Sequence, residues 1–151
     1  MKNVKWTFLF FLTTFISLGA TAQKSDIEAV KQTLDSYKQK IESLDTSGVA
    51  QLFVADSKVI EQAKDEGTIS HYLEHHLGPE LKDFKSFKFS NYKVDVQLNG
   101  AYAYSTESYI YTIILKDGKE IRSQGFATSL LQKIKGQWKI VQTHSSFRKA
   151  R

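Results

Sequence analysis

The 151-residue chain contains no cysteine, one proline and one methionine. The absence of cysteine excludes disulfide bonds, thiolate zinc sites and cysteine nucleophiles. Stability must therefore come from packing, and a chain of this length can bury one hydrophobic core. A strong excess of one charge is also missing, because 21 basic and 16 acidic side chains give a net charge of +5. The basic residues are scattered apart from a short tail at 148–151, so we expect no nucleic-acid binding.

The N-terminus has the pattern of an export signal. Lys2 and Lys5 precede an apolar run over residues 6–18, and Ala-Thr-Ala follows at residues 20–22. A charged start, an apolar centre and small residues before the cleavage point are typical of a secretory signal peptide. The run is also shorter than the roughly 20 residues that a membrane-spanning helix needs. We therefore predict a signal peptide over residues 1–22.

Removal of the predicted signal peptide would define the mature domain and its net charge. Residues 23–151 are expected to form a single domain that a bacterium exports to the periplasm or secretes. Without Lys2 and Lys5 the net charge falls to 19 − 16 = +3. We expect no membrane contact once the signal is removed.

The first half of the chain has helical periodicity. Apolar residues recur every three or four positions from Ile27 to Leu44, which predicts a helix capped by Ser25 or Asp26. A short second helix is expected to carry Val49, Leu52 and Phe53. Further along, the pattern predicts a strand over 58–61, a turn over 64–67 and a third helix that Thr68 opens.

After Phe84 the apolar pattern changes to a period of two. This predicts four strands, over residues 86–98, 101–115, 119–134 and 137–147. Asn99-Gly100 and Asp117-Gly118 are typical hairpin turns, and Lys135-Gly136 supplies the third. Helices followed by such a meander predict an α+β domain, with an antiparallel sheet covered by helices on one face.

The most unusual segment is residues 71–81, which holds three of the four histidines and the only proline. Residues 71–75 match H-x-x-E-H, the pattern of inverted zinc peptidases. However, Leu73 and Leu77 mark the buried stripe of this helix, whereas His71 and His75 fall on the opposite face. We interpret that pair as solvent-exposed. His76 lies beside the stripe, one turn after Tyr72, where it is either packed at the edge of the core or directed into a pocket.

Two strand faces carry further polar candidates. On the last strand, alternate residues pass from apolar to polar, as if the face ran from the core into a cavity. These residues are Trp138, Ile140, Gln142, His144 and Ser146. On the second long strand, Glu107 shares a face with Tyr109 and Tyr111. If this face points inward, Glu107 is a buried base with a raised pKa. If it points outward, Glu107 is an ordinary surface residue.

The order of elements, and the run Gly136-Gln137-Trp138-Lys139-Ile140-Val141 followed by His144 at the strand end, carry a resemblance. Over about residues 25–148 the chain resembles the superfamily of nuclear transport factor 2, ketosteroid isomerase and the SnoaL-like proteins, in particular a small exported bacterial branch. The resemblance implies a cone-shaped curved antiparallel sheet, mixed at its edge, with about three N-terminal helices enclosing a pocket. It also implies dimerisation through the outer sheet face. Isomerases, dehydratases, cyclases and binding modules all share this fold.

Residues and resemblance together predict an exported domain that binds a small hydrophobic or amphipathic molecule, with lyase, isomerase or hydrolase activity left open. In an enzyme, His144 would be the general base, His76 would polarise the substrate, and Glu107 would face them across the cavity. Contacts to the ligand are expected from Tyr72, Tyr109, Trp138, Gln142 and Ser146. No cofactor is expected.

Two alternatives remain open from the sequence. In the first, a divalent ion such as zinc is held by His76, His144 and one carboxylate, from Glu107, Glu61 or Glu80. In the second, the domain is a dimeric interaction module that has no catalytic activity.

Overall fold

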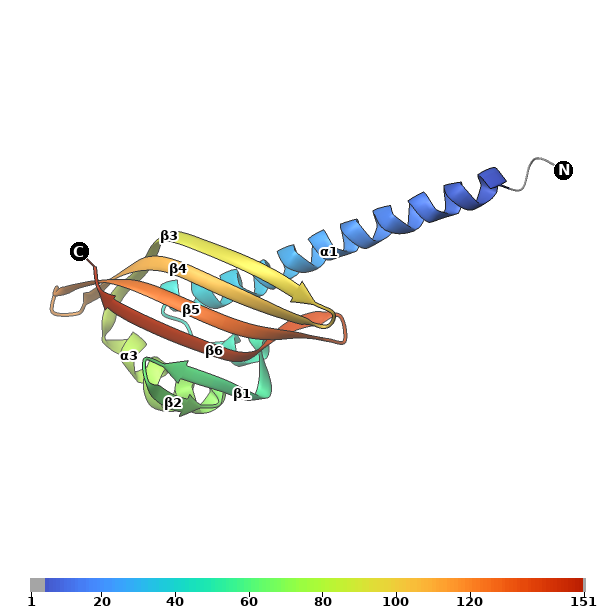
Figure 1. The fold of residues 1–151 in the computed structure, drawn as a ribbon. Helices are drawn as coiled ribbons and strands as arrows, with labels where there is room; N and C mark the ends of the chain where they lie inside the picture. Colours follow the sequence, from blue (N-terminus) through green and yellow to red (C-terminus); the bar gives the residue numbers. More distant parts are fainter. Residues whose placement is uncertain (1–4, 151) are drawn as a thin grey trace.

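The chain folds into one curved six-stranded sheet with helices packed on one face (Figure 1). The computed structural model describes the backbone of residues 5–150 and the side chains of residues 22–150. The elements are α1 (Lys5–Glu42), the 3₁₀ turn η1 (Val49–Leu52), β1 (Phe53–Glu61), β2 (Lys64–Gly67), α2 (Ile69–Tyr72), the π-helical η2 (Leu73–Leu77), α3 (Gly78–Asp83), β3 (Phe84–Asn99), β4 (Tyr102–Leu115), β5 (Glu120–Ile134) and β6 (Gln137–Lys149).

The sheet order is β2-β1-β6-β5-β4-β3. The β1–β6 pair is parallel, and the other neighbouring pairs are antiparallel. The predicted α+β class with a sheet mixed at its edge is therefore confirmed. The four strands of the meander begin and end within two residues of the predicted bounds.

Helix α1 packs against β3 and β6. It continues through Ser25 and Asp26, so the prediction that one of them caps a helix is wrong. Asp26 instead accepts a hydrogen bond from Trp138 Nε1 at 3.2 Å and pairs with Lys133 Nζ at 2.5 Å.

The predicted signal segment, residues 1–22, lies almost wholly outside the residues whose side chains are described. Among the helices that the structure describes, none is long and apolar enough to cross a membrane.

The segment between α1 and α2 differs most from the sequence prediction. The expected second helix is a single 3₁₀ turn after Gly48, and β1 begins at Phe53 rather than at residue 58. The predicted turn over 64–67 is strand β2, which pairs with β1 in a hairpin. β2 lies at the sheet edge, where charged residues are favoured because they discourage pairing with another chain, and this explains its polar sequence. The prediction for Thr68 is confirmed, since its hydroxyl accepts from the His71 N–H at 3.3 Å.

A β-bulge in β6 changes which residues face the helices. Ile140 pairs with Leu131, but Gln142 pairs with the adjacent Leu130, so Val141 is an extra residue. A bulge of this kind reverses the alternation of side chains beyond it. Trp138 and Ile140 are buried before the bulge, whereas Thr143 is the buried residue after it. A second register shift, between Ser90 and Lys93, acts in the same way on β3.

Candidate functional site

A cavity of about 550 Å³ lies between the inner sheet face, α1 and the segment from Glu61 to Glu80. Aromatic rings from β3 and β4 form one wall. Phe89 contacts Phe87 and Tyr109 with ring centroids 4.9 and 5.0 Å apart, and Phe87 contacts Tyr111 at 5.3 Å. Tyr37 of α1 faces the cavity opposite the sheet. The cavity is therefore apolar through most of its length, as sites for small organic molecules usually are.

Glycine at position 125 allows the Tyr109 ring to lie on the sheet. Gly125 is the β5 partner of Tyr109. A Cβ built on Gly125 would lie 2.2 Å from Cε2 of the Tyr109 ring. Because β5 has no side chain here, the ring can cover the strand and form part of the cavity wall.

Glu107 provides a single carboxyl group within the aromatic wall. Its side chain is 8% exposed and lines the cavity. Burial raises the pKa of Glu107, although the hydrogen bond from the Tyr92 hydroxyl, 2.5 Å from Oε2, favours the charged form. The structure thus places Glu107 inward, which was one of the two orientations left open by the sequence.

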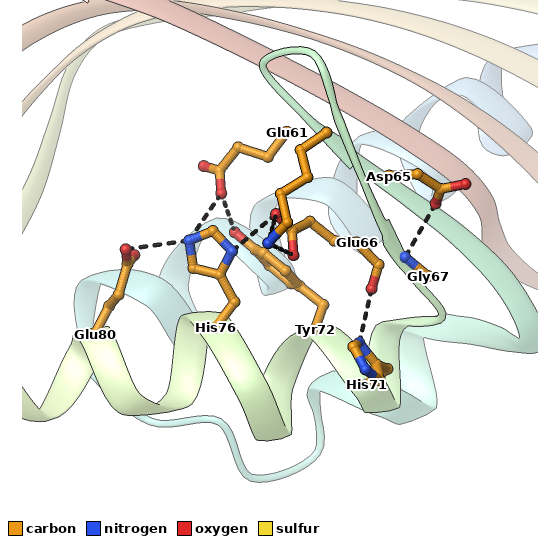
Figure 2. A network of polar contacts seen from close by, with 9 residues as sticks. Glu61, Asp65, Glu66, Gly67, His71, Tyr72, His76 and Glu80 are labelled. Atoms are coloured by element: carbon orange, nitrogen blue, oxygen red, sulfur yellow. Dashed lines mark hydrogen bonds and ion pairs between the residues drawn. The ribbon is translucent and has the colours of Figure 1, made fainter.

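A second polar group lies on another part of the cavity wall. We call Glu61, Glu66, His76 and Glu80 the carboxylate–histidine cluster (Figure 2). His76 Nδ1 is 3.0 Å from Glu66 Oε1, and His76 Nε2 is 3.1 Å from Glu80 Oε1 and 3.5 Å from Glu61 Oε2. The Tyr72 hydroxyl donates to Glu61 Oε2 at 3.1 Å. Four elements, β1, β2, η2 and α3, therefore bring one imidazole into contact with three carboxylates.

Two opposing effects set the pKa values in this cluster: burial, and pairing with groups of opposite charge. Burial lowers the pKa of His76, but the three surrounding carboxylates outweigh it and raise that pKa overall. Burial raises the pKa of Glu61, and His76 and Tyr72 only partly oppose this effect. For Glu66, burial is outweighed by Lys64 and His76, which lower the pKa. The Lys64 ammonium lies 3.0 Å from Glu66 Oε1.

The π-helical turn η2 aims His76 at the cluster. Gly78 N–H donates to Leu73 O, five residues earlier, where an α-helix would use a residue four earlier. A Cβ on Gly78 would lie 2.2 Å from that same oxygen, so the turn requires glycine. His71, Glu74 and His75 are exposed, as predicted. The match to the zinc-peptidase pattern therefore lies outside the cavity.

The prediction that His76 and His144 face one another is wrong. His144 is exposed, and its Nε2 lies 3.0 Å from the backbone oxygen of Gln62. Gln142 and Ser146 are also exposed, because the bulge at Val141 turns all three away from the cavity. The expected metal set of His76, His144 and Glu107 is not brought together either.

Of the other residues predicted to contact a ligand, some line the cavity and one lies in the core. Tyr72 and Tyr109 line the cavity, whereas Trp138 is buried in the core and bonded to Asp26. On β6 the cavity is lined instead by Thr143, Ser145 and Phe147. Sequence reasoning also missed Glu66, which it placed in a turn, and Tyr92, which lies within the register shift between Ser90 and Lys93. Neither residue stands in a motif that could have identified it.

Comparison with known proteins agrees with this geometry. A family model described as "SnoaL-like domain" matches residues 30–149. A search of curated proteins finds no match. Among solved structures, a nuclear transport factor 2-like superfamily protein from Salmonella enterica serovar Typhimurium has a TM-score of 0.73 at 18% identity, covering 85% of this chain and 94% of that one.

Two further structures are similar to this chain. A candidate ketosteroid isomerase from Shewanella frigidimarina has a TM-score of 0.69 at 25% identity, and the match covers 78% of this chain and 94% of that one. A candidate scytalone dehydratase from Novosphingobium aromaticivorans has a TM-score of 0.70 at 17% identity, with coverage of 87% and 89%. The cone fold is thus shared with proteins of several different names.

Proposed function

This chain belongs to the SnoaL-like domain family, and on that basis we propose that it binds a small, largely apolar molecule and transfers a proton on it, as an isomerase or dehydratase does. The observation that carries the proposal is the buried Glu107 carboxyl in an otherwise aromatic part of the cavity wall. Two similar structures bear the names of an isomerase and a dehydratase, which supports this reaction class.

The cavity favours a ligand with an apolar body and a polar group. Its volume of about 550 Å³ lies in the range of sites for small organic molecules. Rings of Phe87, Phe89, Tyr109 and Tyr111 offer flat surfaces on which a ring system can pack. The polar group of the ligand would lie next to Glu107, because this residue supplies the carboxyl group of that aromatic wall.

Glu107 has the properties of a general base for carbon acids. A carboxylate that burial makes more basic takes a proton more readily than one in water. The Tyr92 hydroxyl fixes its orientation through Oε2. Burial raises the pKa of Tyr37 and of Tyr109, so both hydroxyls stay protonated and can donate to an oxygen that gains negative charge.

Proton exchange on a ketone tests this proposal. In D₂O, the protein is expected to accelerate deuterium incorporation at C1 of 2-tetralone, followed by proton NMR. E107Q should reduce the catalysed rate by about 100-fold or more, because it removes the base. E120Q changes an exposed carboxyl and should leave the rate unchanged. An unaccelerated wild type, or an equal rate in E107Q, would overturn the proposal.

Export and dimerisation complete the proposed function. The N-terminal pattern supports export, which cell fractionation with an antibody would test. The outer sheet face exposes Tyr104 and Phe126, at 55% and 49%, and such side chains favour association through this face. Light scattering should therefore give the mass of a dimer, and Y104E combined with F126E should give that of a monomer.

A further inference from the structure

We infer that Glu61, Glu66 and His76 form a site for one divalent metal ion on the cavity wall. The three residues come from β1, β2 and η2, and each offers one ligand atom within 4.8 Å of the others. This site lies apart from Glu107 and does not depend on the proton-transfer proposal. It also differs from the H-x-x-E-H match, which shares none of the three residues.

The strongest support comes from two buried atoms that face each other. Glu66 is 4% exposed, and among the described residues neither its Oε1 nor the Nδ1 of His76 makes a hydrogen bond, although Lys64 Nζ forms an ion pair with that Oε1 at 3.0 Å. They lie 3.0 Å apart without the geometry of a hydrogen bond. Buried polar atoms that make no hydrogen bond are costly. A metal ion bound to both atoms would satisfy them together.

The other nitrogen of His76 is already placed as metal sites require. Metal-bound histidines usually donate the second ring N–H to a carboxylate, which fixes the tautomer. His76 Nε2 lies 3.1 Å from Glu80 Oε1, so a proton on Nε2 leaves the Nδ1 lone pair free for a metal. Tyr72 likewise fixes the Glu61 carboxylate through a hydrogen bond to Oε2. Glu80 and Tyr72 are positioning residues for the site.

The donor set identifies the class of ion. One imidazole nitrogen with two carboxylate oxygens suits Zn²⁺ or a similar first-row ion, with bond lengths near 2.1 Å. Two atoms bound to one such ion lie at most about 4.2 Å apart, and the three ligand atoms already lie within 4.8 Å of one another, so only small movements are needed to bind an ion. Three protein ligands leave the fourth position open toward the cavity, which these residues line.

Lys64 pairs with one of the proposed ligands and would compete with a metal ion for it. Its ammonium is 3.0 Å from the same Glu66 Oε1 that faces His76. The side chain is 71% exposed, so it can swing into water when an ion arrives. Removal of Lys64 should therefore strengthen metal binding.

Titration of the purified protein with ZnCl₂ tests the site, using calorimetry and native mass spectrometry. We expect one Zn²⁺ per chain, with affinity at least 100-fold weaker in H76Q and E66Q. In E80Q we expect a loss of 10-fold or more. K64M should bind about 5-fold more tightly, because it removes a competing positive charge. H75Q is the matched control, being one residue away on the exposed side, and should bind as the wild type does.

Specific outcomes would overturn the inference. These are the absence of one-to-one binding in both the wild type and K64M, binding kept in H76Q, or binding lost in H75Q. Circular dichroism and thermal unfolding of the metal-free variants separate lost binding from lost folding. K64M removes a single exposed side chain, so an increase in affinity can be measured even if E66Q fails to fold.

Discussion

Replacing Glu107 by glutamine should make the stability of this protein less dependent on pH. Burial raises the pKa of Glu107 in the folded protein above its value in the unfolded chain. Between those two values the folded state holds a proton that the unfolded state lacks. The contribution of Glu107 is therefore fully present below the unfolded pKa and is lost as the pH rises through the folded pKa. Glutamine has no proton to lose, so E107Q should not show this loss.

The size of the effect follows from one buried proton. A single group changes the free energy of unfolding by at most about 1.4 kcal/mol per pH unit. The advantage of E107Q over the wild type should grow at up to this slope above the unfolded pKa, and then level off above the folded pKa. At low pH both side chains are neutral and accept from Tyr92, so the two proteins should differ by no more than about 1 kcal/mol.

Urea unfolding followed by circular dichroism, at half-unit steps from pH 4 to pH 8, measures this difference. E120Q serves as the control for removal of one negative charge, because Glu120 is exposed on β5. A difference between E107Q and wild type that stays constant with pH would refute the reasoning, as would an advantage of E107Q that shrinks as the pH rises. The first result would mean that Glu107 ionises as easily in the fold as in water, and the second that it ionises more easily in the fold.

Three other substitutions test the packing around the cavity. G125A should push the Tyr109 ring into the cavity and cost about 1–3 kcal/mol, measured by urea unfolding, because the new Cβ would lie 2.2 Å from the ring. G78A should cost a similar 1–3 kcal/mol and weaken Zn²⁺ binding in calorimetry, because its Cβ would lie 2.2 Å from Leu73 O in the π-turn. L131A should cost about 2–5 kcal/mol, seen as a lower midpoint in thermal unfolding, because Leu131 is fully buried.

The sequence predicted the sheet well because its signals are local. Asn99-Gly100 and Asp117-Gly118 mark hairpins, and Gly100 and Gly118 adopt the positive φ values, 59° and 87°, that such turns need. The alternation along β4 runs without interruption from Ala103 to Ile113 and places Glu107 on the inner face, one of the two orientations that the sequence left open. Resemblance to the family then supplied the curvature that a periodic pattern alone does not specify.

The site was harder to predict because its residues depend on local departures from regular geometry. No glycine or proline marks Val141 as the bulge residue, so His144 was assigned to the inner face. A Gly-Pro pair is typical of a helix end, whereas here Gly78 closes a π-turn and Pro79 lies in the first turn of α3. Glu66 lies in a short polar edge strand, and its sequence cannot be distinguished from that of a turn.

The bulge in β6 also has a consequence for comparing relatives of this protein. Because the bulge adds one residue to the strand, every later side chain lies on the opposite face of the sheet from the one that regular alternation would give it. In this chain it assigns Thr143, Ser145 and Phe147 to the cavity and leaves His144 to contact the β1–β2 turn from outside. Two relatives with the same letters over this strand, but with and without the bulge, would present different chemistry to a ligand. Their sites should therefore be aligned by strand register rather than by sequence letters.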